Sequence, residues 1–379
     1  MASFARPFVF GIVPGELDTF LTSRLLALIL IALLGGCSKP PAAAKPTFVV
    51  GWSVYVGWNP WYYMAKSGIL NKWADKYNVA IRVQRFDYAP SLDAFVAKNI
   101  DACAMTNMEA LDMPASANID TTSIITGDYS NGNDALMTRH DLKLNQLPGH
   151  KVLLVEKTVS QYLFERALTL NGMEKQIDQV KLVNTSDSDI ATAFIGDTSQ
   201  DAVVTWKPMV SQIAKQKDVK TLFNSSQIPG EIVDLMVVRT DILKRPDGSG
   251  ERFAKALAGA WYETTKLMSG PAGAETDKVL KDIAAGSEDT LESYKEQLST
   301  TNLFYAPQAA ADFTTNPEFK TKMNLVRQFC FAHALLGANT KSVDDVGIQF
   351  PDGSVQGSKD RITLRFDANY MQMAAQGKL

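Results

Sequence analysis

The segment Asp101-Ala102-Cys103-Ala104-Met105-Thr106-Asn107 is the main indication of the fold in this sequence. It is a short apolar run typical of a buried strand, and helical sequence begins near Asn107. A similar unit, Asp201-Ala202-Val203-Val204-Thr205-Trp206-Lys207-Pro208, again places Asp-Ala before an apolar strand that ends at threonine. Two such units predict two similar lobes, each directing the carboxyl end of a strand at one cleft, where open α/β sheets bind ligands.

Short β-branched runs alternate with amphipathic segments from Thr47 onward, which is typical of α/β architecture with mostly parallel sheets. The first strand is expected at 48–52, and Pro60 opens the helix that follows it. After Arg239, helical segments are expected to dominate. We expect this C-terminal run, which the tail 361–371 ends, to pack as a helical brace rather than as a third domain.

The N-terminal part of the chain has the pattern of an export signal. Arg24 precedes the short apolar run 25–34, which is followed by Gly35-Gly36-Cys37. This pattern indicates a lipidated cysteine that becomes the mature N-terminus. A transmembrane anchor is disfavoured because the run is well short of the ~20 residues that span a bilayer. We therefore predict a signal peptide at 1–37, lipidation of Cys37, a proline-rich tether at 38–46, and a periplasmic or extracellular location on the cytoplasmic membrane.

Composition and motifs exclude several classes of function. With 46% hydrophobic and 21% charged residues the chain is in the globular range, and its net charge of -3 argues against nucleic acid as a partner. Cys103 and Cys330 are expected to be buried free thiols, although a disulfide is an alternative. The three histidines lack metal-binding spacing, and the usual nucleotide and hydrolase motifs are missing. We expect no metal, no cofactor and no enzymatic activity.

Polar and aromatic residues gather at the predicted strand-to-helix junctions, whose loops converge on the cleft of a doubly wound fold. The residues expected to contact a ligand are Ser53, Tyr55, Trp58, Asn59, Thr106, Asn107, Glu109, Asp128, Tyr129, Asp134, Ser160, Gln161, Trp206 and Asp234. Simpler roles are open for several of them. Asn59, Asn107 and Ser160 suit helix caps, 128–134 suits a solvated turn, and the aromatic residues suit a core.

Several segments resemble the nitrate/sulfonate/taurine-type solute-binding proteins of ABC importers. The similarity lies in the order and spacing of Gly51-Trp52-Ser53, Trp58-Asn59-Pro60, Ala65-Lys66-Ser67-Gly68, Lys98-Asn99-Ile100-Asp101-Ala102, Asp128-Tyr129-Ser130, Gly132-Asn133-Asp134 and the unit 201–208. The resemblance implies a two-lobed periplasmic-binding-protein fold (type II) with two crossover strands, near 134–138 and 234–239. The lobes would be 47–136 with 235–379, and 137–234, and they would close on the ligand.

The same resemblance implies the partners of the protein. They would be a small-molecule solute, an ABC permease with its ATPase, and the membrane through the lipid anchor, with the protein itself a monomer. Two further segments, 105–111 and 364–371, are similar to a subgroup of urea-binding proteins associated with urea or guanidine carboxylase systems.

The charges of the junction loops point away from an anion. They carry Glu109, Asp128, Asp134, Glu231 and Asp234, with Lys207 as the single cation expected there. Carboxylates accept the paired N–H donors of a planar cation, and aromatic faces attract its charge. We therefore predict capture of a guanidinium- or urea-like solute.

Two alternatives stay open. One is a binding protein for nitrate, taurine or another sulfonate. The other is an enzyme like the thiamine-pyrimidine synthases, which share the two-lobed fold, although the cysteine cluster of those enzymes has no counterpart in this sequence.

Overall fold

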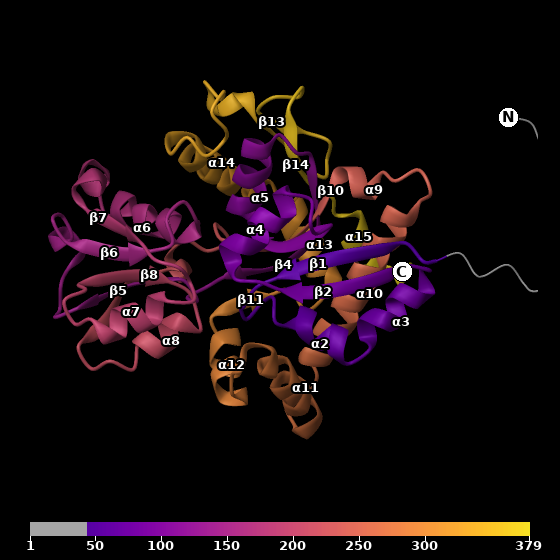
Figure 1. The fold of residues 1–379 in the computed structure, drawn as a ribbon, viewed down its shortest axis with the longest axis horizontal. Helices are drawn as coiled ribbons and strands as arrows, with labels where there is room; N and C mark the ends of the chain where they lie inside the picture. Colours follow the sequence, from indigo (N-terminus) through magenta and orange to yellow (C-terminus); the bar gives the residue numbers. More distant parts are fainter. Residues whose placement is uncertain (1–43) are drawn as a thin grey trace, which may run out of the picture. The chain divides into compact units, whose positions relative to one another are not determined.

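The computed structural model describes residues 44–379. The predicted signal, the lipidation site at Cys37 and most of the predicted tether lie outside the described residues. The chain from Pro46 to Leu379 forms one compact unit. Its strands form two separate β-sheets, which helices accompany, as Figure 1 shows. The predicted α/β architecture with two sheets is confirmed, whereas the lobe boundaries stay a prediction.

The larger sheet has nine strands. In spatial order they are β13 (Val355–Gln356), β12 (Gly347–Gln349), β14 (Ile362–Phe366), β4 (Thr121–Ser130), β10 (Val233–Arg239), β3 (Ala102–Thr106), β1 (Thr47–Trp52) and β2 (Ala80–Arg85), with β11 (Thr301–Leu303) paired to β4. β1 is parallel to β2 and β3, but β10 runs antiparallel to both β3 and β4. The sheet is therefore mixed, not mostly parallel as expected, because β10 returns from the other sheet in the opposite direction.

Helices accompany this sheet along most of its length. They are α2 (Pro60–Lys66), α3 (Ile69–Lys76), α4 (Tyr88–Val96), α5 (Asn107–Ala117), α9 (Thr240–Leu243), α10 (Ser249–Met268), α11 (Ala274–Ala284), α12 (Leu291–Leu298), α13 (Pro307–Thr315), α14 (Pro317–Ala332) and α15 (Asn369–Ala375). Aromatic stacking attaches α10: Phe253 lies on Phe48 of β1 at 4.3 Å between ring centroids, and Trp261 lies on Trp61 of α2 at 5.2 Å.

The C-terminal tail differs from its prediction. Instead of ending a helical brace, it inserts β14 between β12 and β4, with Leu364 opposite Thr121. Leu364 and Phe366 are buried, and the guanidinium of Arg365 donates to both carboxylate oxygens of Asp120. The alternation of large apolar residues in Ile-Thr-Leu-Arg-Phe is the period of a strand, so this element belongs to the core of the sheet.

The smaller sheet has five strands: β7 (Lys181–Asn184), β6 (Lys151–Leu154), β8 (Ala202–Thr205), β5 (Ala135–Arg139) and β9 (Val219–Asn224). In Figure 1, α6 (Val159–Leu170) lies on one face, and α7 (Ile190–Gly196) and α8 (Met209–Ile213) lie on the other. Successive residues of a strand point to opposite faces. Accordingly, Met137 and Val203 pack in a cluster with Phe194 of α7, while Leu136 and Val204 belong to the main core.

The chain passes between the two sheets twice, from β4 to β5 through residues 131–134 and from β9 to β10 through residues 225–232. These two crossing segments are bonded to each other. The backbone N–H of Ser225 donates to the carbonyl oxygen of Asp134 at 2.9 Å, and the Ser225 hydroxyl lies 2.6 Å from that of Ser130. The functional residues considered below lie around these two segments.

Several other expectations can be compared with the described residues. Cys103 and Cys330 are both buried and free, as expected. Within residues 44–379, no helix has the length and apolar character needed to cross a membrane. The same range holds no group of His, Cys, Asp and Glu side chains arranged to bind a metal ion.

Candidate functional site

The sheet brings two acidic residues together where β3, β10 and β4 reach the same edge. Asp234 of β10 lies opposite Thr106 of β3 on one side and opposite Asp128 of β4 on the other. Residues that face each other across a ladder point to the same face of the sheet, with Cβ atoms about 4.5–5.5 Å apart. The carboxyl groups of Asp128 and Asp234 are therefore neighbours, and the Thr106 side chain lies beside them.

Both carboxyl groups are buried, with exposed fractions of 0% for Asp128 and 2% for Asp234. Both side-chain oxygens of Asp128, and Oδ2 of Asp234, find no hydrogen-bond donor within residues 44–379. We call these atoms the open oxygens. Burial raises the pKa of Asp128 to about 7, and burial with the charge of Asp128 raises the pKa of Asp234 well above its usual range. The pair therefore resists carrying two negative charges.

Asp134 and Glu109 add two more carboxyl groups. The Ser130 hydroxyl donates to Asp134, and burial raises the pKa of Asp134 to about 7. Glu109 accepts hydrogen bonds from the Thr106 hydroxyl and, through Oε1, from the backbone N–H of Val159 at 3.0 Å. Val159 is the first residue of α6, so a carboxyl group of the protein itself occupies the amino end of that helix, where an external anion would otherwise bind.

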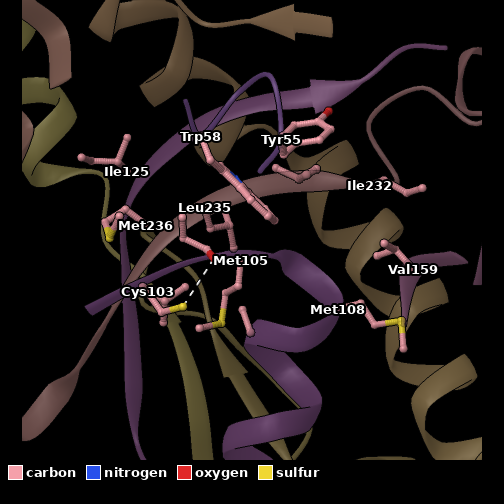
Figure 2. Packing of buried hydrophobic residues seen from close by; sticks show 14 of the residues in the cluster. Tyr55, Trp58, Cys103, Met105, Met108, Ile125, Val159, Ile232, Leu235 and Met236 are labelled. Carbon is pink, nitrogen blue, oxygen red and sulfur yellow. Dashed lines mark hydrogen bonds between the residues drawn. The ribbon is translucent and has the colours of Figure 1, made fainter. Parts of the chain in front are cut away.

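A connected series of aromatic rings lies near these acids. Tyr55 and Trp58 have ring centroids 5.1 Å apart, Trp58 and Tyr88 5.3 Å, and Tyr88 meets Trp206 edge-on at 5.8 Å. All four rings are buried. Figure 2 shows Tyr55 and Trp58 in the apolar packing from which the series starts. Such ring faces attract cations.

A small cavity lies between the rings and the acids. Its lining comes from segments of both sheets and consists of Tyr55, Trp58, Tyr88, Thr106, Asp134, Val159, Trp206, Ile232 and Asp234. None of these described lining residues is a lysine, arginine or histidine. The cavity is narrow, with a volume of about 10 Å³. In this conformation the space is enough for about one water molecule, so a solute of several non-hydrogen atoms requires the cavity to widen.

Many of the predicted ligand residues meet at this place. Those that line the cavity are Tyr55, Trp58, Thr106, Asp134, Trp206 and Asp234. Asp128, Glu109, Ser53 and Ser160 are buried but do not line it. The cap of α6 is Thr158, not Ser160, because the Thr158 hydroxyl accepts from the Ser160 backbone N–H at 3.2 Å. A ligand contact by any of these residues stays a prediction.

Asn107 and Tyr129 lie outside the cavity and have structural contacts instead. The Asn107 amide donates to the backbone oxygen of Glu231 and accepts from the backbone N–H of Val233, each at 3.0 Å. It thereby fixes the start of β10. Tyr129 follows Asp128 in β4 and therefore points to the opposite face, where its ring stacks on Phe313 at 5.6 Å.

Asn59 and Gln161 also lie outside the cavity lining. The Asn59 amide donates to the Ser287 hydroxyl at 2.7 Å, and its side chain makes no capping bond to α2. Gln161 accepts from the backbone N–H of Lys157 at 2.9 Å and donates to Glu165 at 3.0 Å. Asn59 therefore occupies the N-cap position of α2 without capping it through its side chain, and Gln161 holds the first turns of α6.

Lys207, the cation expected at the junctions, is not part of the cavity. Its ammonium group donates to the carboxylate of Glu296 and to the Thr300 hydroxyl, at 2.8 Å for the latter. The side chain is buried, and its charge is matched by Glu296. Because Lys207 is paired with Glu296, it does not act as a counter-charge for the acids of the cavity.

Three cavity residues were missed by the sequence analysis: Tyr88, Val159 and Ile232. Tyr88 begins α4 soon after β2, and its hydroxyl oxygen accepts from the backbone N–H of Thr106 at 3.2 Å. Tyr88 is an aromatic residue at a strand-to-helix junction, so the pattern that predicted the other cavity residues also applies to it. Val159 and Ile232 lie within selected junctions but are apolar, and only polar and aromatic residues were chosen there.

Helix α6 of the five-stranded sheet is bonded to the second crossing segment and to the end of α14. Arg166 donates to both carboxylate oxygens of Glu231, at 2.8 and 2.9 Å, and the Tyr162 hydroxyl donates to the same carboxylate at 2.5 Å. Glu165 is paired with Nε2 of His333, at the end of α14, at 2.8 Å. These contacts hold the amino end of α6, and with it Val159, against the cavity.

Comparisons with known proteins place the fold. No family model matches the sequence, and no curated protein matches it. Among solved structures, the alkanesulfonate-binding protein SsuA from Xanthomonas axonopodis pv. citri, bound to MOPS, has a TM-score of 0.60 at 13% identity, over 78% of this chain and 96% of that one. The aliphatic sulphonate-binding protein SsuA from Escherichia coli has a TM-score of 0.60 at 16% identity, over 77% and 94%.

An enzyme is also among the similar structures. The desulfurization enzyme DSZB has a TM-score of 0.51 at 12% identity, over 77% of this chain and 93% of that one. At these identities the likeness concerns the fold. The chain has the periplasmic-binding-protein fold, and that prediction is confirmed.

Proposed function

We propose that this chain is an extracytoplasmic solute-binding lipoprotein of an ABC importer. The proposal is supported by the shared fold, which covers 96% and 94% of the two SsuA chains, and by a buried cavity lined from both sheets. Closure of the lobes 47–136 with 235–379 and 137–234 would capture the solute. Lipidation at Cys37 would hold the monomer at the membrane, near the permease and ATPase that receive the solute.

We propose that the solute is a small guanidinium- or urea-like molecule. The observation that carries this choice is the lining of the cavity, where Asp134 and Asp234 face Trp58, Tyr88 and Trp206. A planar guanidinium group presents paired N–H donors to carboxylates and its positive face to aromatic rings. Urea offers the same donors without the charge.

The amino end of α6 supports a cation or neutral solute over an anion. Helix amino ends are ready sites for anions, since their first backbone N–H groups have no partner within the helix. Here the N–H of Val159 already donates to Glu109, and that of Ser160 donates to Thr158. An anion in the cavity would have to displace Glu109 and would also face Asp134 and Asp234.

A sulfonate, taurine or nitrate is the second candidate. It is favoured by the solved structures, two of which are described as proteins that bind alkanesulfonates or aliphatic sulphonates. To hold an anion in this cavity, Asp128, Asp134 and Asp234 would have to be protonated and act as donors. The cavity would also have to widen for a molecule as large as MOPS.

An enzyme of the thiamine-pyrimidine-synthase type is a weaker candidate. The likeness to DSZB shows that this fold can also carry catalysis. A thiol nucleophile is disfavoured, because burial raises the pKa of Cys103 to about 12 and also raises the pKa of Cys330. Mass spectrometry after incubation with guanidinium, urea and taurine would reveal any turnover.

Isothermal titration calorimetry tests the choice of solute. The full chain in mild detergent would be titrated with guanidinium, urea, nitrate and taurine. The proposal expects guanidinium or urea to bind more tightly than either anion. Tight binding of taurine or nitrate, with neither guanidinium nor urea bound, would favour the second candidate.

A further inference from the structure

Two acids occupy one cross-strand position of the nine-stranded sheet. Like charges directly opposite each other destabilise a β-ladder. The neighbouring positions of this β10–β4 ladder pair Val233 with Tyr129 and Leu235 with Thr126, so Asp128–Asp234 is the acidic pair among uncharged neighbours. The arrangement is stable when one carboxyl group is neutral or when a cation lies beside the pair.

We propose that Asp128 and Asp234 share one proton in the ligand-free protein and release it when a guanidinium-like cation binds. This inference rests on the proposed function and names the residues that set the charge of the solute. A proton on one carboxyl group lets it donate to the other, which satisfies an open oxygen on each side. When the cation binds, its N–H groups replace the shared proton as hydrogen-bond donors to the carboxyl groups.

The exchange keeps the charge of the site constant. With one proton the pair carries a single negative charge. After the proton leaves for solvent, the pair carries two negative charges and the bound cation one positive charge, so the sum is unchanged. An exchange of this kind avoids burying an additional net charge, which is costly in a protein interior. Urea is neutral, so the pair would keep its proton when urea binds.

The titratable groups that face the pair are acids and tyrosines, of which the neutral Tyr55 hydroxyl lowers the pKa of both carboxyl groups as a hydrogen-bond donor. They are Tyr55 from the loop after β1, Asp134 from the first crossing segment, Tyr294 of α12 and Tyr305 after β11. Glu109 of α5 in turn faces Asp134. The ionised form of each of these groups is negative. None of them can therefore replace the proton as a counter-charge, whereas a cationic solute can.

Calorimetry in two buffers measures the proton directly. Guanidinium and urea would be titrated into the full chain at pH 7 in phosphate and in Tris, whose ionisation enthalpies differ. We expect about one proton released per guanidinium bound and none per urea, with guanidinium affinity rising up to about tenfold per pH unit below the titration of the pair. Guanidinium binding without proton release would overturn the shared proton and leave the proposed function standing.

A second readout works without any solute. In the ligand-free full chain, carbon-13 NMR of the aspartate carboxyl carbons should show Asp128 and Asp234 titrating together and holding one proton at neutral pH. Two ionised carboxylates at that pH would overturn the inference even if guanidinium does not bind. Failure of guanidinium to bind would instead count against the proposed function.

Substitutions assign the proton to the pair. Asp234→Asn should abolish the proton release and weaken guanidinium binding at least tenfold. Asp112→Asn is the matched control. Asp112, in α5, is a buried acid like Asp234, but it does not line the cavity. It should leave the proton count unchanged. Release of a full proton by the Asp234→Asn variant would show that the proton comes from elsewhere and would overturn the proposal.

Discussion

At the scale of single residues, Gly57 determines where the Asp128 carboxyl group can lie. A Cβ atom built on Gly57 would overlap that carboxylate. The lack of a side chain therefore lets the loop after β1 pack directly on the acid, and it brings Trp58, the next residue, to the cavity.

Gly57→Ala should displace the Asp128 carboxyl group. We expect a loss of stability of about 1–3 kcal/mol, the usual cost of overpacking, and weaker guanidinium binding. Differential scanning calorimetry is the suitable measurement, since the denaturants urea and guanidinium are themselves candidate solutes. Gly196→Ala is the control, because a Cβ there meets nothing within 4 Å. Equal behaviour of the two variants would contradict this account.

Trp206 should matter more for a charged solute than for a neutral one. A cation over an aromatic face gains about 0.5–2 kcal/mol, which is roughly a 2- to 30-fold change in affinity. We expect Trp206→Leu to weaken guanidinium binding by this factor and urea binding by less. The urea titration of the same variant is the control. Equal losses for both solutes would show that Trp206 acts through shape alone.

The acids of the site could be predicted from sequence because they stand at strand ends, where α/β sheets bind ligands. Their orientation could not. Asp128 and Tyr129 are consecutive, and only the pairing of β4 with β10 determines that Asp128 points to Asp234. In the same way, Asn107 and Lys207 form hydrogen bonds with residues far away in the sequence, which the sequence alone does not indicate.

At the scale of elements, α6 and the end of α14 are joined by a pair that responds to pH. The hydrogen bond with Glu165 raises the pKa of His333 above its usual 6.5. Because the folded value is the higher one, the stabilisation is complete below about pH 6.5 and is lost as the pH rises through the raised value.

Replacing Glu165 should remove this part of the pH dependence. Between about pH 6.5 and 8, we expect the melting temperature of the wild type to fall relative to that of Glu165→Gln. His333→Gln should behave like Glu165→Gln, because either change removes the pair. A constant difference between wild type and both variants across this range would rule out the pair as the cause.

The strand expected at 48–52 and the two strand-to-helix units correspond to β1, β3 and β8, whereas β11, β12 and β13 were not expected. β11, β12 and β13 are too short for a hydrophobic period to appear, and they form only by pairing with partners distant in sequence. The tail that contains β14 was expected only as the end of a helical brace. Its own alternation in 362–366 was the better guide.

At the scale of the whole molecule, the two crossing segments meet at Ser225. Its hydroxyl oxygen accepts from the backbone N–H of Gly132 at 2.7 Å and lies next to the hydroxyl of Ser130, which donates to Asp134. The connection between the two sheets and an acid of the cavity are thus held by one buried side chain.

Ser225→Ala should weaken both the fold and the site. Loss of the hydroxyl leaves the Gly132 N–H without its acceptor, at a cost of about 1–3 kcal/mol. We expect a lower melting temperature and weaker guanidinium binding, since Ser130 is then free to turn from Asp134. Ser226→Ala is the control, because Ser226 is exposed and its hydroxyl bonds only to Asn224 in the described structure. An unchanged Ser225→Ala variant would contradict this role.

The fold as a whole was accessible from the two similar strand-to-helix units, because each dictates a local α/β arrangement. The size of the cavity was not, since it depends on how α6 and the loop 228–232 meet. That contact is made by Arg166 and Tyr162 with Glu231, and the sequence alone gives no sign that these residues are partners.

The most direct test of the central claim is a crystal structure of the protein grown with guanidinium and, separately, with taurine. We expect guanidinium in the cavity, hydrogen-bonded to Asp234 beside Asp128 and lying against the ring of Trp206 or Tyr88. Taurine should leave the cavity unoccupied. A sulfonate group bound there, with Glu109 displaced from the amino end of α6, would contradict the account.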